Sequence, residues 1–244
     1  MYLSWIIPAY NEERRIEKTL REVDVFLRSQ NFVGGYEIVV ADSASRDATQ
    51  EIVKKMSAEI PELRLFNVES KGKGLAVKKA MLNAKGEIRL FSDADNSTAP
   101  DNFLAMRELF SKGNEVVISS RDHKDASGAA RDIKEPWHRE IIGNVGNIII
   151  QLFGGVWGIW DTQNGFKALS AKAAEDIFSR SLMSGFSFDI EMLALARRLN
   201  YKIAIIPIRW KFDPDSKVTP ADYFKVFADV FKIRWNLIWN KYHV

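Results

Sequence analysis

Short apolar, strand-like runs alternate with helical patterns through the first half of the sequence. The strand-like runs are LSWIIPA (3–9), YEIVVA (36–41), LRLFNV (63–68), EIRLFS (87–92) and EVVISS (115–120). Helical periodicity lies between them, over residues 12–29, 47–58, 74–84 and 101–111. Alternating units of this length predict an α/β fold, with a mainly parallel, Rossmann-like sheet flanked by helices.

No repeat, low-complexity stretch or proline-rich linker interrupts the 244 residues. We therefore expect residues 1–244 to form a single domain with two functional halves, 1–120 and 121–218, and a C-terminal amphipathic helix over 219–244.

Composition narrows the class of protein. Hydrophobic residues make up 46% and charged residues 27% of the chain, which are globular values. A net charge of +3, with no basic tract interleaved with aromatics, argues against nucleic acid as a partner. The chain has no cysteine and its first residues lack the features of a signal peptide, so a cytoplasmic location is expected.

Polar residues follow each of the first four strand-like runs. The carboxyl ends of parallel strands meet at one edge of a sheet, and ligands bind beyond that edge. We therefore expect one binding site there, formed by Asn11 and Glu12, Asp42, Lys71 and Lys73, and Asp93 and Asp95.

The DAD segment after the fourth run is the candidate metal site. Carboxylates two positions apart at a strand end can point the same way, and oxygen ligands suit Mg²⁺ or Mn²⁺ bridging a diphosphate. The alternative is a turn that caps the next helix. A second match, Asp213 and Asp215, lies in a polar stretch that no such convergence supports.

Two segments could meet a membrane surface. Residues 141–160 carry no formal charge but contain three amides and five glycines, which predicts a buried or interfacial helix followed by a glycine-rich loop. Near the C-terminus, helical spacing places Phe224, Phe227, Phe231, Trp235, Ile238 and Tyr242 on one face, with Trp239 at its margin and Lys225, Lys232, Arg234 and Lys241 beside it. The alternative is a helix packed on the core of the domain.

Several motifs together resemble family 2 glycosyltransferases. In chain order they are IPAYNEERRI, DSASRDAT, KGKGLAVKKAM, FSDADNST, SSR, DTQNGFKALS, FSFDIE and SKV, over about residues 4–218. The chain looks most similar to the polyprenyl (dolichyl) phosphate glucosyl- and mannosyltransferases. That resemblance implies a GT-A fold, and inverting transfer of glucose or mannose from a nucleotide sugar, UDP-glucose or GDP-mannose, to a polyprenyl phosphate lipid.

The resemblance also implies roles for individual residues. Residues 1–120 become the nucleotide-sugar-binding half and 121–218 the acceptor half. Nucleotide-sugar-binding residues would be Pro8, Ala9, Tyr10, Glu12, Asp42, Lys73, Asp93, Ala94, Asp95 and Gln163. Asp93 and Asp95 would hold Mg²⁺ or Mn²⁺, acceptor-phosphate residues would be Arg121, Arg131, Arg139 and Lys217, and catalytic residues would be Asp93, Asp95, Arg121 and Asp189. DADNST favours the glucosyl branch over the mannosyl branch.

A phosphate acceptor would be nucleophilic without a general base, because its second pKa is about 6. The alternatives are a family 2 enzyme with a carbohydrate hydroxyl acceptor, for which Asp189 is the candidate base, and a non-catalytic nucleotide- or lipid-binding module. The region 121–140 is interpreted as a loop that either stays solvated or orders over the lipid phosphate. Peripheral attachment to the cytoplasmic membrane face completes the hypothesis.

Overall fold

The computed structural model describes residues 1–131, 137–210 and 220–244, with side chains described outside 131, 137–145 and 220–223. The strands are β1 Leu3–Ala9, β2 Tyr36–Ser43, β3 Leu63–Val68, β4 Ile88–Ser92, β5 Val116–Ser120, β6 Ala130–Arg131, β7 Phe166–Ser170, β8 Ile203–Pro207 and β9 Arg209–Trp210. The helices are α1 Ile16–Ser29, α2 Thr49–Ser57, α3 Lys73–Asn83, α4 Phe103–Ser111, α5 Trp137–Gly154, α6 Ala171–Arg180, α7 Phe188–Arg198 and α8 Pro220–Ile238, with a 3₁₀ turn, η1, at Pro100–Asn102.

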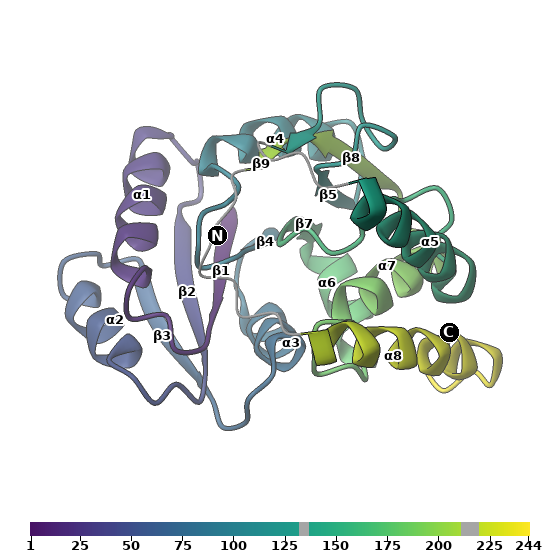
Figure 1. Ribbon diagram of the computed structural model, residues 1–244. Helices are drawn as coiled ribbons and strands as arrows, with labels where there is room; N and C mark the ends of the chain where they lie inside the picture. The colour runs from purple at the N-terminus through teal and green to yellow at the C-terminus, as the bar shows by residue number, and fades with distance from the viewer. Residues whose placement is uncertain (132–136, 211–219) are drawn as a thin grey trace.

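Seven strands form one sheet in the order β3-β2-β1-β4-β7-β5-β8 (Figure 1). All neighbouring pairs are parallel except those of β7, which runs antiparallel to both β4 and β5. The mainly parallel sheet and the five predicted strands are thus confirmed. The sequence patterns did not indicate β7, a strand from residues 121–218 that inserts between β4 and β5 of residues 1–120.

Both faces of the sheet are covered by helices, which is why the central strands are almost continuously apolar. Side chains of a strand alternate between faces. In β1, Trp5 and Ile7 pack with α1, α2 and α4, whereas Ile6 packs in a second cluster with α3, α6 and α7.

Helices α5 and α8 pack side by side at one end of the molecule (Figure 1). The rings of Phe153 and Phe231 lie 4.8 Å apart between them. The predicted helix within 141–160, followed by a glycine-containing loop, is confirmed. However, α5 begins at Trp137, so the end of the region predicted as a loop over 121–140 is helical. None of the helices in the described ranges combines the length and the apolar composition needed to span a bilayer.

The predicted aromatic face of the C-terminal helix is partly wrong. Helix α8 buries Val226, Val230 and Ile233 against the domain. Tyr242 is only 1% exposed and does not lie on the outer face. The reason is that the helix ends at Ile238, so its periodicity does not extend to Tyr242, whose hydroxyl turns back and donates to Glu191 Oε1 at 2.8 Å.

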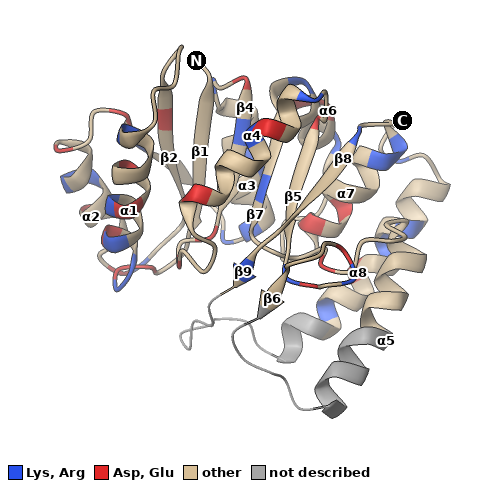
Figure 2. Ribbon diagram, turned by 90° about the horizontal axis from the view of Figure 1, so that it is seen from above, with Lys and Arg blue, Asp and Glu red and all other residues tan. Residues whose placement is uncertain are grey.

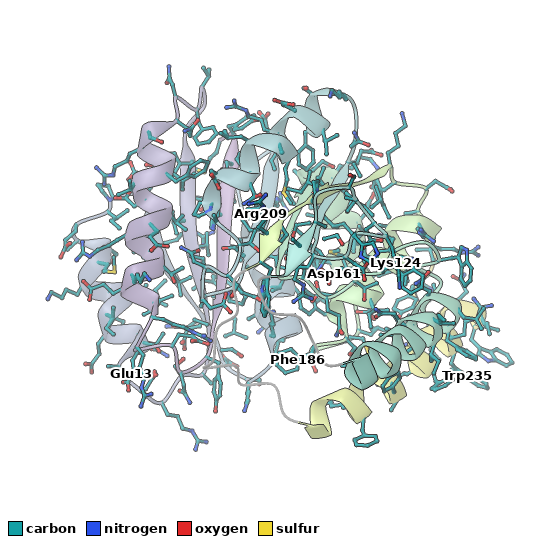
Figure 3. The ribbon with its side chains drawn as sticks, turned by 45° about the horizontal axis from the view of Figure 1, so that its top comes forward. Glu13, Lys124, Asp161, Phe186, Arg209 and Trp235 are labelled. Atoms are coloured by element: carbon teal, nitrogen blue, oxygen red, sulfur yellow. The ribbon has the colours of Figure 1, made fainter. Side chains whose placement is uncertain are left out.

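The outer face of the helix pair is nevertheless strongly apolar. Its described turns in α5 carry no charged side chain (Figure 2). Trp235 lies at the outer edge of the pair (Figure 3). The exposed large apolar residues here, called the outer apolar patch below, are Ile148, Leu152, Phe224, Phe231, Trp235, Ile238 and Trp239.

Candidate active site

The loops after β1 and β2 are joined by hydrogen bonds. The backbone N–H of Asn11 donates to Ser45 Oγ at 2.8 Å, and Asn11 Oδ1 accepts from the N–H of Arg46 at 2.8 Å. The N–H of Glu12 donates to Thr49 Oγ1 at 2.7 Å. Residues that are 34 to 37 positions apart in the chain therefore form one platform at the sheet edge.

Asp42 is fully buried at the end of β2. Its Oδ2 accepts hydrogen bonds from the N–H of Ser45 at 3.0 Å and from Gln50 Nε2 at 2.6 Å. Its Oδ1 is buried and has no hydrogen-bond partner among the described residues. Because a buried acceptor without a donor costs free energy, a ligand N–H or O–H that reached it would be stabilised.

The other residues predicted on β1 differ in how they can contribute. Pro8 and Ala9 are buried in the strand, opposite Ala41 and Asp42 of β2. Glu12 is buried, and its carboxylate pairs with Arg15. Tyr10 is half-buried, and the Lys71 ammonium group lies 4.3 Å from the centroid of its ring. Through this contact the loop after β3 reaches the loop after β1.

Asp93 and Asp95 lie in a turn after β4 that other elements fix. The hydroxyl of Thr19 in α1 donates to the carbonyl of the buried Ala94 at 2.6 Å. The N–H of Ser97 donates to Asp95 Oδ1 at 2.9 Å. Burial, together with the neighbouring charge of Asp93, raises the pKa of Asp95 above its usual range.

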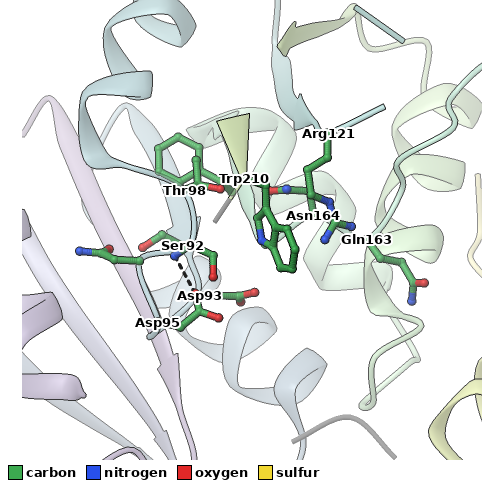
Figure 4. Close-up of a pocket in the computed structure, with 12 residues that line it drawn as sticks. Ser92, Asp93, Asp95, Thr98, Arg121, Gln163, Asn164 and Trp210 are labelled. Carbon is green, nitrogen blue, oxygen red and sulfur yellow. Dashed lines mark hydrogen bonds between the residues drawn. The ribbon is translucent and has the colours of Figure 1, made fainter. Parts of the chain in front are cut away.

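An open cleft of about 320 Å³ lies beside this turn (Figure 4). It is lined by residues of both halves of the chain: Ser92, Asp93, Asp95, Asn96, Ser97, Thr98, Arg121, Gln163, Asn164, Gly165, Phe166 and Trp210. Four of the predicted site residues, Asp93, Asp95, Arg121 and Gln163, are therefore brought together.

Arg121 is fixed in the cleft by Asp161. Nε and Nη2 of Arg121 each donate to a carboxylate oxygen of Asp161 at 2.8 Å. Burial opposes ionisation of Asp161, but the charge and hydrogen bonds of Arg121 outweigh it and hold the pKa of that carboxyl below its usual range. The Arg121 guanidinium also lies 5.2 Å from the ring centroid of Trp210.

The described start of the predicted acceptor loop is attached to the domain. Asp125 accepts hydrogen bonds from the N–H groups of Trp160 at 2.7 Å and Asp161 at 2.8 Å. The Lys124 ammonium group lies 3.7 Å from the Trp160 ring centroid. Lys124 and Asp161 are labelled in Figure 3. These contacts hold the described start of this region against the segment that carries Trp160 and Asp161.

Asp189 lies behind the cleft rather than on its lining. It is buried and forms an ion pair with the buried Lys167 of β7. Burial raises the pKa of Asp189 and lowers the pKa of Lys167. A carboxylate in this position can orient its neighbours, and the predicted catalytic role of Asp189 stays a prediction.

Three predicted acceptor residues cannot be placed in the same detail. Arg131 is in β6 and Arg139 is in α5, but their side chains lie outside the described set. Lys217 lies outside the described residues, as do Asp213 and Asp215. Their contact with an acceptor phosphate stays a prediction.

The residues present fit a divalent cation. Asp93 and Asp95 supply oxygen ligands in the cleft, where Asp95 is two positions from Asp93 and its pKa is raised by burial and then by the charge of Asp93. Among the described residues, no three His, Asp or Glu side chains are grouped so that they could hold a metal ion. A cation beside Asp93 and Asp95 would therefore take its other ligands from substrate or water. Two carboxylates with phosphate oxygens and water would match the way Mg²⁺ is usually bound.

Sequence reasoning missed Asp161, Gly165 and Trp210. The first two stand within the motif DTQNGFK, which is the sequence signal that could have identified them. Trp210 stands in no such motif. The pairing of β8 with β5 and the turn into β9 bring it to the cleft, so no local sequence pattern indicates it.

A mainly parallel sheet with an acidic turn after β4 and a cleft beside it is the arrangement of the GT-A fold. Solved structures support this fold: the chain superposes on glucosyl-3-phosphoglycerate synthase from Mycobacterium tuberculosis in complex with Mn²⁺, UDP-glucose and phosphoglyceric acid. The TM-score is 0.68 at 20% identity, covering 96% of this chain and 80% of the other.

Residues 4–178 match the model of glycosyl transferase family 2, and the chain belongs to that family. A dolichyl-phosphate beta-glucosyltransferase of Trichomonas vaginalis is 33% identical over 96% of this chain and 71% of its own length. The Drosophila melanogaster dolichyl-phosphate beta-glucosyltransferase is 32% identical over 99% of this chain and 76% of its own length. The resemblance found in the motifs is thus confirmed.

Proposed function

We propose that this glycosyltransferase transfers glucose from UDP-glucose to a dolichyl or related polyprenyl phosphate. The observation that carries the proposal is the single cleft in which Asp93 and Asp95 lie together with Arg121. Carboxylates suit the cation of a leaving diphosphate, and a guanidinium suits a phosphate nucleophile. The names of the relatives support glucose and dolichyl phosphate as the two substrates.

A divalent cation on Asp93 and Asp95 would neutralise charge on the departing diphosphate. The chain's own residues would bind and orient the substrates. Asp42 Oδ1 would accept a hydrogen bond from the base or ribose, and Asp161 would hold Arg121 toward the acceptor. Because a phosphate monoester is already ionised at pH 7, no residue has to remove a proton from it.

The acceptor lipid would be reached from a membrane surface through the outer apolar patch. Two hydrogen bonds connect the cleft lining to α8, the helix that carries most of this patch. Gln163 on the lining donates to the carbonyl of Phe186 at 3.5 Å, and the next residue, Ser187, is hydrogen-bonded to Asp229 of α8. Apolar and aromatic side chains flanked by lysine and arginine are typical of helices that lie in a membrane interface.

The proposal is tested by incubating the full chain with labelled UDP-glucose, Mn²⁺ and a polyprenyl phosphate, and measuring label in the organic phase. Matched reactions contain GDP-mannose in place of UDP-glucose, or the neutral polyprenol in place of its phosphate. We expect transfer only with UDP-glucose and the phosphate. In a further reaction a free sugar replaces the lipid, and label on that sugar would favour a hydroxyl acceptor. UDP-glucose binding without any transfer would favour a binding module.

A further inference from the structure

Lys73 forms an ion pair with one of the two candidate metal ligands. It is the first residue of α3, and its Nζ lies 2.6 Å from Asp93 Oδ1. The Lys73 side chain is 21% exposed and that of Asp93, which lines the cleft, is 35% exposed, so neither partner is fully buried. The pair connects the loop after β3 to the turn after β4.

The backbone at Gly165 closes another side of the same carboxylate. A Cβ atom at position 165 would stand 2.1 Å from Asp93 Oδ2 and 2.4 Å from Oδ1. The N–H of Asp93 also donates to the carbonyl of Gly165 at 2.9 Å. The backbone at Gly165 covers one side of the Asp93 carboxylate, and Lys73 Nζ lies on Oδ1. A cation that binds Asp93 must therefore compete with the ammonium group of Lys73.

The surrounding charges explain why an ammonium group is held there. Asp93, Asp95 and Asp189 all interact electrostatically with Lys73. Of the other cations nearby, Lys167 is paired with Asp189 and Arg121 with Asp161. Lys73 therefore offsets the repulsion between the two cleft carboxylates, which is the role a divalent cation would also serve.

Resting on the proposed function, we propose that Lys73 is a resident cation of the cleft. It occupies Asp93 in the metal-free enzyme, leaves that carboxylate when a divalent cation binds Asp93 and Asp95, and then contacts the diphosphate of the nucleotide sugar. A lysine is suited to this exchange, because its ammonium group is a point charge on a flexible four-carbon stem.

The test measures Mn²⁺ and UDP binding to the Lys73→Met variant by calorimetry, without any turnover. Removing the competing ammonium group should lower the Kd for Mn²⁺ alone, by about fivefold. Removing a phosphate contact should raise the Kd for UDP at saturating Mn²⁺, by about tenfold. Lys79→Met, an exposed lysine on the same helix, is the matched control and should change neither value.

The two opposite changes in Kd separate this role from a structural one, because loss of a structural contact would weaken the binding of both Mn²⁺ and UDP. Unchanged or weaker Mn²⁺ binding by Lys73→Met with a native circular dichroism spectrum overturns the inference. If that variant does not fold, Lys73→Gln is held to the same two outcomes. Wild-type protein that binds Mn²⁺ and UDP but transfers no glucose refutes the proposed function and leaves the lysine exchange standing.

Discussion

The ammonium group of Lys167 in β7 lies against the carboxylate of Asp189 in α7, and both side chains are buried. Lys167 Nζ also donates to the carbonyl of Asn164 on the cleft lining, at 2.5 Å. The motifs DTQNGFK and FSFDIE are thus two sides of one contact beneath the cleft.

Breaking this pair should be costly, because it leaves a buried charge without a partner. We expect Lys167→Met to lower the free energy of unfolding by about 3–5 kcal/mol. The double variant Lys167→Met/Asp189→Leu should recover much of that loss, since no buried charge remains. Urea unfolding of these two variants and of Asp189→Leu alone measures both effects, and strictly additive losses would contradict the pairing.

Asp161 should make stability depend on pH. Its pKa in the folded chain is lowered, so its contribution is fully present above about pH 4 and is lost as the pH falls through the folded-state pKa. We expect Asp161→Asn to cost about 3 kcal/mol at pH 7. The difference from wild type should shrink below pH 4 in urea unfolding.

The control for that experiment is Asp24→Asn, which removes an ion pair on the surface of α1 with the half-exposed Arg28. It should cost under about 1 kcal/mol. If the difference in unfolding free energy between wild type and Asp161→Asn stays constant from pH 7 to pH 3, Arg121 does not lower the pKa of Asp161.

Gly165 should be required for metal binding rather than for folding. A methyl group there overlaps the Asp93 carboxylate, which must then move. We expect Gly165→Ala to weaken Mn²⁺ binding by at least about tenfold, with the cooperative unfolding transition retained. Gly185→Ala is the control, because the nearest contact of its Cβ would be 3.9 Å away. Equal Mn²⁺ affinity in both variants would count against the placement of Asp93.

The outer apolar patch should bind lipid. Trp235 and Trp239 are both more than half exposed, and their rings lie 5.5 Å apart. The double variant Trp235→Ser/Trp239→Ser should bind anionic vesicles at least about tenfold more weakly in a sedimentation assay. Val25→Ser on α1, which also removes an exposed apolar side chain, should bind like wild type. Wild-type protein that stays in the supernatant would refute the lipid-binding surface.

The alternation of strands and helices, and the edge at which the site lies, could be predicted from the sequence. Strand and helix periods are local properties, since each depends on which side chains within one segment are apolar. Parallel pairing of β1, β2 and β3 then follows from chain order, and it gathers the loops that carry Asn11 and Asp42. The division into two functional halves stays a prediction.

The sequence alone determined the first five strands, the helices between them and which carboxylates follow β4, because these patterns are written within a few consecutive residues. Only the tertiary structure decided that Lys73 pairs with Asp93, that Asp161 holds Arg121 and that Tyr242 turns inward. The physical reason is that each of these contacts joins residues at least 20 positions apart. Their distance depends on how β7 inserts between β4 and β5 and on where α8 ends, which no single segment encodes.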